Sequence, residues 1–381
     1  MGRELLMIPG PTNVDPAVLE AMAKPPVSHM SPRYGEILRW VLTALRKVFA
    51  TDGEVFVLAG SGTVAQEAGA ANIVEPGDDV LCLVHGQFGE RLVEIVKRHG
   101  GCPDILGVEW GKSITADFVR RALGKKRYKA VTAVHVDTST GVSLPLREIC
   151  EVVSDEGPFF IVDTVCSLGG VEVKTDEWGI DVNCSCSQKC LAAPPGLALL
   201  ALSKRVMEFI SDRKEPVGMY FSDVRNWVAA MHEPERFYFA TPPVNMIYAL
   251  EAALKIVLAE GLDNRFRRHH VMAEAFRKAM DALSLRIVAE DGYAADTVTA
   301  VYYPKDVEDQ AFRSEVARKG VVITRGFGPL QGRVFRVGHM GNVDGEAILA
   351  TVEAIEAALN TLTKTSNSGV GVKAAKETLH P

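Results

Sequence analysis

The sequence contains no long apolar run and no excess of basic charge. None of its apolar segments reaches the roughly 18 residues that a membrane-spanning helix needs, and the apolar stretch near Met1 is too short for a secretion signal. The 42 basic and 48 acidic residues give a net charge of -6, which disfavours a dedicated nucleic-acid or polybasic membrane surface. We therefore expect a cytoplasmic protein with neither nucleic-acid nor membrane partners.

Cysteine is present, but not in the spacing of a metal site. The seven cysteines include no Cys-x-x-Cys pair, which structural zinc sites normally use. An odd number of cysteines without a secretion signal is typical of reduced thiols. Cys184, Cys186 and Cys190 are close in sequence, but the first two lie in a strand-like run. We interpret them as small buried residues and expect no metal.

The first two-thirds of the chain alternates between strand-like and helix-like patterns. Apolar strand-like runs lie at 55–59, 79–84, 130–136, 159–165, 181–187 and 197–202. Helix-like patterns lie between several of them, at 64–74, 88–98 and 146–153. This rhythm predicts an α/β fold in which helices cover both faces of a mostly parallel sheet.

The pattern changes after about residue 205, where long helices precede a few short strands. We therefore predict an N-terminal arm (1–15), a large domain (16–258), a smaller C-terminal α+β domain (259–363) and a flexible tail (364–381). The basic segment 265–270 is expected to be a solvated helix face.

Gly60-Ser61-Gly62-Thr63 joins an expected strand to an expected helix. Glycines allow close backbone approach, and the start of a helix offers unpaired N–H groups and positive dipole charge. The segment therefore suits a phosphate. An ordinary turn capped by Ser or Thr is the alternative. The third glycine of a dinucleotide fingerprint and the Gly-Lys-Ser/Thr of a Walker A loop are both missing.

Two polar residues follow buried strands in the manner of a Schiff-base site. Asp163 ends the apolar run 159–162, and Lys189 comes directly after the run 181–187. A lysine amine can condense with the aldehyde of pyridoxal phosphate while a carboxylate holds the ring nitrogen protonated. A helix-capping aspartate and a surface lysine are the simpler alternatives. Arg336 lies in the apolar run 334–337 and could bind a carboxylate, or be an edge-strand arginine.

Taken together, these motifs resemble the class V aminotransferase family of fold-type I pyridoxal-phosphate enzymes. The similarity runs from Pro9 to about Leu362 and is greatest to the alanine–glyoxylate and serine–pyruvate aminotransferases. The motifs that carry it are, in chain order, GSGT at 60–63, GQFGER at 86–91, TSTG at 138–141, VDTVCSLGG at 162–170, SQK at 187–189 with PPG at 194–196, and FRVG at 335–338. The resemblance implies a large domain with a seven-stranded-type sheet and a smaller C-terminal domain.

The resemblance also implies which residues hold the cofactor and the substrate. Lys189 would form the Schiff base and Asp163 would pair with the ring nitrogen. The remaining expected cofactor contacts are Ser61, Gly62 and Thr63 at the phosphate, Phe88 on the ring face, Thr138 at the ring hydroxyl, Ser167 and Gln188 beside the ring, and Tyr238 and Thr241 at the phosphate of a neighbouring subunit. Arg336 would bind the substrate carboxylate, with Gly10 also on the substrate side.

The activity implied by the resemblance is ping-pong transamination through pyridoxamine phosphate, from alanine or serine to glyoxylate or pyruvate, in a homodimer with shared sites. Aspartate as donor is an alternative, which would need a second cation near Arg336; His29 or Arg33 could supply it. A lyase resembling cysteine desulfurases would need a late nucleophilic cysteine, whereas the last one is Cys190. A non-catalytic binding protein with this fold is a further alternative. Arg325 and His339 are other candidates for the substrate pocket.

Overall fold

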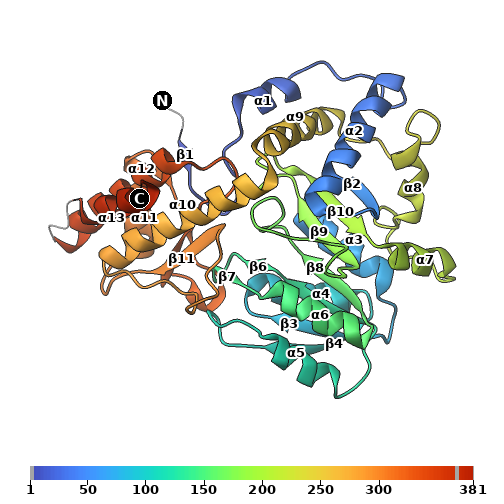
Figure 1. Cartoon of the computed structure of the whole chain (residues 1–381), viewed down its shortest axis with the longest axis horizontal. Helices are drawn as coiled ribbons and strands as arrows, with labels where there is room; N and C mark the ends of the chain where they lie inside the picture. Colours follow the sequence, from blue (N-terminus) through green and yellow to red (C-terminus); the bar gives the residue numbers. More distant parts are fainter. Residues whose placement is uncertain (1–3, 365–368, 381) are drawn as a thin grey trace.

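A seven-stranded sheet forms the centre of the larger part of the molecule (Figure 1). The computed structural model describes residues 4–364 and 369–380. From one edge of the sheet to the other, the strands are β2 (Glu54–Gly60), β10 (Gly196–Leu202), β9 (Val182–Cys186), β8 (Phe159–Asp163), β5 (Ala130–Val134), β3 (Asp79–Val84) and β4 (Cys102–Gly107). The strands from β9 to β4 pair in parallel, whereas β10 is antiparallel to both β2 and β9. The expected mostly parallel sheet is therefore confirmed.

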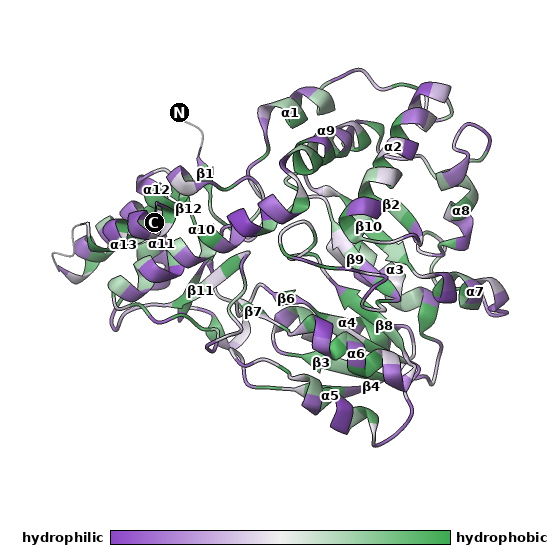
Figure 2. Ribbon diagram, in the orientation of Figure 1, coloured by the Kyte–Doolittle hydropathy of each residue, from purple (hydrophilic) through white to green (hydrophobic). Residues whose placement is uncertain are grey.

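Helices cover both faces of this sheet, because its central strands are apolar on both sides. Figure 2 shows the strands as a hydrophobic layer between helices whose outer faces are hydrophilic. One core joins β2 and β10 to α2 and α9, and a second joins β5 and β8 to α5 and α6. The helices of this part are α1 (Pro16–Met22), α2 (Pro32–Phe49), α3 (Gly62–Ile73), α4 (Gln87–Arg98), α5 (Ala116–Leu123), α6 (Leu146–Glu156), α7 (Lys204–Asp212), α8 (Arg225–His232) and α9 (Val244–Glu260).

Local capping chemistry fixes where several of these helices begin. Ser31 accepts a hydrogen bond from the Tyr34 N–H at the start of α2, and Pro32 occupies the first turn, where its missing N–H costs nothing. Ser203 caps α7 in the same way through the Val206 N–H. No helix within the described residues combines the length and apolar character needed to cross a bilayer.

The C-terminal part has its own small sheet and core, on the left in Figure 1. Its three-stranded sheet has the order β11 (Val298–Tyr302), β14 (Val334–Gly338), β13 (Thr324–Arg325). Three helices pack against it: α10 (Leu262–Ala282), α11 (Asp309–Arg318) and α12 (Gly345–Thr363). A single 3-10 turn, Gly328–Leu330, lies between β13 and β14. Two short strand pairs complete the description: β1 (Leu5–Leu6) with β12 (Val321–Val322), and β6 (Val136–Asp137) with β7 (Val142–Ser143).

Three features were not anticipated from the sequence. The arm 1–15 adds strand β1 to the C-terminal part, where it pairs with β12. The expected flexible tail contains helix α13 (Val370–Leu379), which packs on α10 and α12, although residues 365–368 of it lie outside the described residues. In the basic segment 265–270, Arg265 and His269 are fully buried. Contacts between distant segments decide all three, so local composition did not reveal them.

Candidate active site

The ends of two neighbouring parallel strands bring an acid and a lysine to the same edge of the large sheet. Asp163 is the last residue of β8, and Lys189 follows β9 after a short turn. The strands pair with Asp163 opposite Cys184. Ligands of open α/β sheets bind at this carboxyl edge. Both side chains line one cavity of about 150 Å³, together with Ser61, Gly62, Thr63, Phe88 and Gln188. The structure thus brings together most of the residues that the sequence singled out.

The Asp163 carboxylate is buried where it lines this cavity. One of its oxygens accepts a hydrogen bond of 2.7 Å from the Val165 N–H, and the other accepts one from the Gln66 side-chain amide. Burial raises the pKa of Asp163 to about 6, although both hydrogen bonds act in the opposite direction. The site therefore favours a positive charge beside Asp163.

Lys189 is half-buried and lies against the N-terminal segment. Its ammonium donates a hydrogen bond to the Pro9 carbonyl. Gly10 has φ +101°, and a Cβ there would lie 2.5 Å from the Lys189 Cδ. A side chain at position 10 would displace the end of the Lys189 side chain, and only glycine adopts this backbone conformation without strain. Gly10, predicted from the resemblance, is therefore in contact range of Lys189.

The start of α3 lines the same cavity through Ser61, Gly62 and Thr63. Ser61 is the N-cap residue, but its side chain makes no capping hydrogen bond. The Thr63 hydroxyl accepts a hydrogen bond of 3.1 Å from Arg91. The guanidinium of Arg91 lies 4.7 Å from the centroid of the Phe88 ring. Backbone donors, hydroxyls and a cation thus converge where an anion would be stabilised.

The neighbouring helix α4 is arranged differently, since a protein carboxylate occupies its N-terminus. The fully buried Asp137 accepts hydrogen bonds from the Phe88 N–H (2.9 Å) and the Gly89 N–H (3.3 Å). A Cβ on Gly86 would lie 2.5 Å from the Asp137 carboxyl carbon, so a glycine is needed there. Of the two helix starts beside the cavity, only that of α3 remains available for a ligand.

Several buried polar atoms around the cavity have no hydrogen-bond partner within the described residues. They are the side-chain oxygens of Gln66, Ser167 and Gln188. Unpaired buried polar groups are costly, so a ligand with polar substituents would relieve them. Thr138 is buried nearby, and its carbonyl accepts a hydrogen bond from Arg336. These residues fit a cofactor with a phosphate at one end and a protonated ring nitrogen at the other.

Arg336 lies in the centre of the small sheet, not at an edge. Its strand β14 runs between β11 and β13, which excludes the edge-strand alternative. The guanidinium donates 2.8 Å hydrogen bonds to the carbonyls of Thr138 and Arg325 and lies 4.3 Å from the centroid of Phe327. Burial lowers its pKa to about 10. Within the described residues it forms no ion pair, and the nearby charge of Asp137 only partly offsets the effect of burial on its pKa.

The other predicted residues lie away from the cavity. Tyr238 and Thr241 are exposed and share a 3.1 Å hydrogen bond, and the His29 ring lies 5.3 Å from Tyr238. His339 is buried and hydrogen-bonded to Thr299 and to the Asp296 carbonyl. Exposed positions are also found for Arg33 and Arg325.

Sequence reasoning missed Gln66 and gave no role to Arg91, although Arg91 ends the GQFGER motif; both residues line the cavity. Gln66 lies one helical turn after Gly62, and Arg91 one turn after Phe88. The i,i+3 and i,i+4 spacing places such residues on the same face of a helix. That spacing was the available signal.

The chain is similar over its whole length to known aminotransferases. The family model described as aminotransferase class-V matches residues 6–331. An uncharacterized aminotransferase of Methanocaldococcus jannaschii is 42% identical over 380 residues, which are 99% of this chain and 98% of the relative. Alanine–glyoxylate aminotransferase 1 of Saccharomyces cerevisiae is 36% identical over 89% of this chain and 92% of its own. The crystal structure of ureidoglycine–glyoxylate aminotransferase from Bacillus subtilis matches with a TM-score of 0.97 at 34% identity, over 100% of this chain and 99% of that one. The chain therefore belongs to the class-V aminotransferase family of fold-type I enzymes, and it is a pyridoxal-phosphate-dependent aminotransferase.

Proposed function

We propose that this aminotransferase moves an amino group from a small amino acid, alanine or serine, to glyoxylate or pyruvate. The observation that carries the proposal is the cavity in which Lys189 and Asp163 meet at the carboxyl edge of the sheet. The Saccharomyces and Bacillus relatives are both named for glyoxylate, which supports this acceptor.

The roles of the two central residues follow from their surroundings. Bound pyridoxal phosphate supplies the carbon that accepts the amino group and a ring that delocalises the electron pair left at the substrate Cα. Asp163 holds a negative charge in a low-dielectric site and so favours protonation of the ring nitrogen. Lys189 would anchor the cofactor covalently at rest. Once freed, its amine would carry a proton from the substrate Cα to the cofactor carbon bearing the amino group, and such acid–base catalysis is worth about 10²–10⁴-fold.

The remaining residues bind and orient the cofactor and the substrate. We assign the phosphate to Ser61, Gly62 and Thr63 at the start of α3, with Arg91 adding positive charge. Phe88 packs on the ring, and Thr138, Ser167 and Gln188 supply polar contacts around it. Arg336 binds the substrate carboxylate, because its guanidinium donates to carbonyl oxygens and forms no ion pair among the described residues. Gly10 leaves space beside Lys189 at the substrate side.

We further propose a homodimer in which Tyr238 and Thr241 complete the phosphate site of the partner subunit. Their exposure, beside the half-buried Phe239, supports this arrangement. A cytoplasmic location also remains a prediction, and the seven free cysteines are compatible with it.

The experiment that tests the proposed function is a matrix of amino donors and keto acceptors on purified protein. We expect alanine or serine with glyoxylate or pyruvate to give the highest kcat/KM. Donor alone should abolish the cofactor's visible band, and acceptor should restore it. The Lys189→Ala variant is the control and should lose both effects. A clear preference for aspartate, or an unchanged spectrum with every donor, would contradict the proposal.

A further inference from the structure

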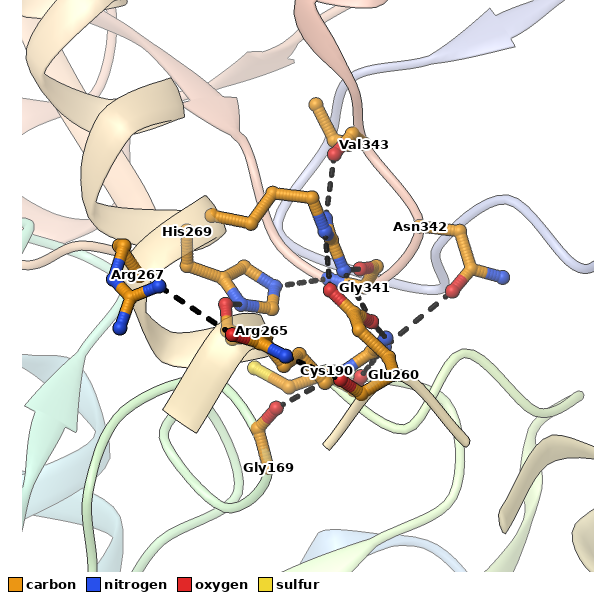
Figure 3. A network of polar contacts seen from close by, with 11 residues as sticks. Gly169, Cys190, Glu260, Arg265, Arg267, His269, Gly341, Asn342 and Val343 are labelled. Carbon is orange, nitrogen blue, oxygen red and sulfur yellow. Dashed lines mark hydrogen bonds and ion pairs between the residues drawn. The ribbon is translucent and has the colours of Figure 1, made fainter. Parts of the chain in front are cut away.

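One buried cation outside the cavity has no role in the function described so far. Arg265, at the start of α10, is 0% exposed. Its Nε donates to the Gly169 carbonyl at 3.1 Å, and one Nη donates to the Cys190 carbonyl at 2.6 Å and to the Asn342 side chain at 3.4 Å. Its other Nη donates to Glu260 at 2.6 Å. Figure 3 shows these partners converging on the guanidinium from separate parts of the chain.

The three segments that Arg265 contacts each follow one of the proposed functional residues. Gly169 ends the turn that begins after Asp163, and Cys190 is bonded directly to Lys189. Asn342 lies in the loop that leaves β14, the strand of Arg336. The single side chain of Arg265 therefore contacts the backbone six residues after Asp163, the backbone of the residue next to Lys189, and a side chain six residues after Arg336.

Neighbouring residues hold the same loop and fix Arg265 in turn. The two oxygens of Glu260 bind Arg265 at 2.6 Å and Arg268 at 2.7 Å. Arg268 also donates to the carbonyls of Gly341 (3.0 Å) and Val343 (2.6 Å). The Gly341 N–H in turn donates to Nε2 of His269 at 2.9 Å. The loop 341–343 is thus tied to α10 by Arg265, Arg268 and His269, which lie within about one helical turn of each other (Figure 3).

The chemistry of this cluster requires an arginine at position 265. Its planar guanidinium donates in several fixed directions, so it can reach three segments at once. A lysine carries the same charge but presents a single compact ammonium, and could satisfy only part of this set. Buried polar groups left unpaired would then shift to find partners.

We propose that Arg265 is a positioning residue for the proposed transamination, one that sets the placement of Asp163, Lys189 and Arg336 relative to one another. It touches neither cofactor nor substrate and acts through the backbone that carries these residues. Displacement of reacting groups by about 1 Å can cost on the order of 10²-fold in rate. The proposal rests on the function proposed above.

The test compares Arg265→Lys with Arg267→Lys in the purified holoprotein. Arg267 is a matched control, because it is exposed on the same helix and bonded only to Asn264 among the described contacts. The measurements are kcat and KM for alanine, the pH midpoint of the cofactor's visible band, and the melting temperature. In assays well below its melting temperature, Arg265→Lys should have a kcat about 10–100-fold lower than the wild type. Its KM should change less, and the pH midpoint of its visible band should move. Arg267→Lys should match the wild type in all four.

A structural role alone would give a different pattern. If Arg265→Lys melts earlier but keeps kcat, KM and the pH midpoint, the proposal is overturned. Should Arg265→Lys fail to fold, Glu260→Gln provides the same test, because it keeps the side-chain shape and removes the charge that holds Arg265. Unchanged kcat, KM and pH midpoint in Glu260→Gln would also overturn the proposal. If no donor reacts with the wild type while Arg265→Lys still moves the midpoint, the proposed function fails and the positioning role stands.

Discussion

At the scale of single residues, the fold holds Asp163 in a buried position that disfavours its ionised carboxylate. Its two oxygens receive hydrogen bonds from Val165 and Gln66, yet burial still raises its pKa to about 6. In the folded protein without cofactor, ionisation of Asp163 therefore costs free energy, and a cation beside the carboxylate would remove this cost. This cost is a property of the site that can be measured without any turnover.

We predict that Asp163→Asn stabilises the cofactor-free protein at pH 7.5. The folded-state pKa of about 6 lies above the ordinary 3.8, so the native state binds more protons between these values. The contribution of Asp163 to folding stability is therefore fully present below about pH 4, and it is lost as the pH rises towards 6. Asparagine carries no charge, and the unpaired Gln66 oxygen can accept from its amide. The expected gain is on the order of 1–3 kcal/mol at pH 7.5 and much less at pH 4.

The measurement is urea unfolding of the cofactor-free protein at the two pH values. Asp155→Asn, at an exposed position of α6, is the control and should show no such difference. An equal effect of Asp163→Asn at both pH values would contradict the prediction.

At the scale of elements, the starts of α3 and α4 lie beside the same cavity but are used differently. The buried Asp137 accepts hydrogen bonds from N–H groups in the first turn of α4, whereas the Ser61 side chain accepts none from the first turn of α3. Sequence reasoning found the α3 motif from its glycines. It could not find Asp137, because a carboxylate from the end of β6 reaches α4 only through the tertiary fold.

Arg91→Gln should weaken binding of pyridoxal phosphate about 10-fold, because one cation near the expected phosphate is lost. Arg91 approaches that site through its 3.1 Å hydrogen bond to Thr63. Equilibrium binding of the cofactor to the cofactor-free protein measures the effect. Arg98→Gln, an exposed position on the same helix, should leave the affinity unchanged. Equal affinities for wild type and Arg91→Gln would rule out this role for Arg91.

The C-terminal helix depends on a buried acid of α12. Glu356 is 4% exposed and accepts hydrogen bonds from the Gly369 N–H (3.1 Å) and the Gly371 N–H (2.5 Å) at the start of α13. We predict that Glu356→Ala lowers the free energy of unfolding by about 1–3 kcal/mol, since the buried Gly371 N–H and the Gly369 N–H lose their acceptor. Glu353→Ala, at an exposed position of α12, should cost less than about 0.5 kcal/mol. Chemical denaturation compares the two, and equal costs would argue against the capping role.

At the scale of the whole molecule, the proposed site takes residues from both the large and the small sheet. Lys189 and Asp163 lie at the edge of the large sheet, whereas Arg336 belongs to the small one. Helix α10 and the N-terminal segment connect the two, through Arg265 and Pro9. The relative placement of the domains therefore decides the geometry of the site.

The proposed dimer can be tested by complementation. Lys189→Ala alone and Tyr238→Ala with Thr241→Ala should each be impaired as pure proteins. Because the proposed sites are shared, a mixed dimer would combine both defects in one site and leave the other intact. Co-expressed and separately tagged subunits should thus recover about half of the wild-type activity per dimer. A mixed dimer no more active than the parent proteins, or an active monomer by sedimentation, would contradict shared sites.

The sequence by itself determined the alternation of strands and helices, the mostly parallel sheet, and the positions of Asp163 and Lys189 at strand ends. These features are local, because apolar periodicity and polar residues at strand ends can be recognised in consecutive residues. The tertiary structure alone decided that β14 is central, that Arg265 is buried, that Asp137 occupies the start of α4 and that residues 370–379 form a docked helix. Each of these depends on contacts between segments far apart in the chain, and a local pattern carries no information about which distant group will supply a partner.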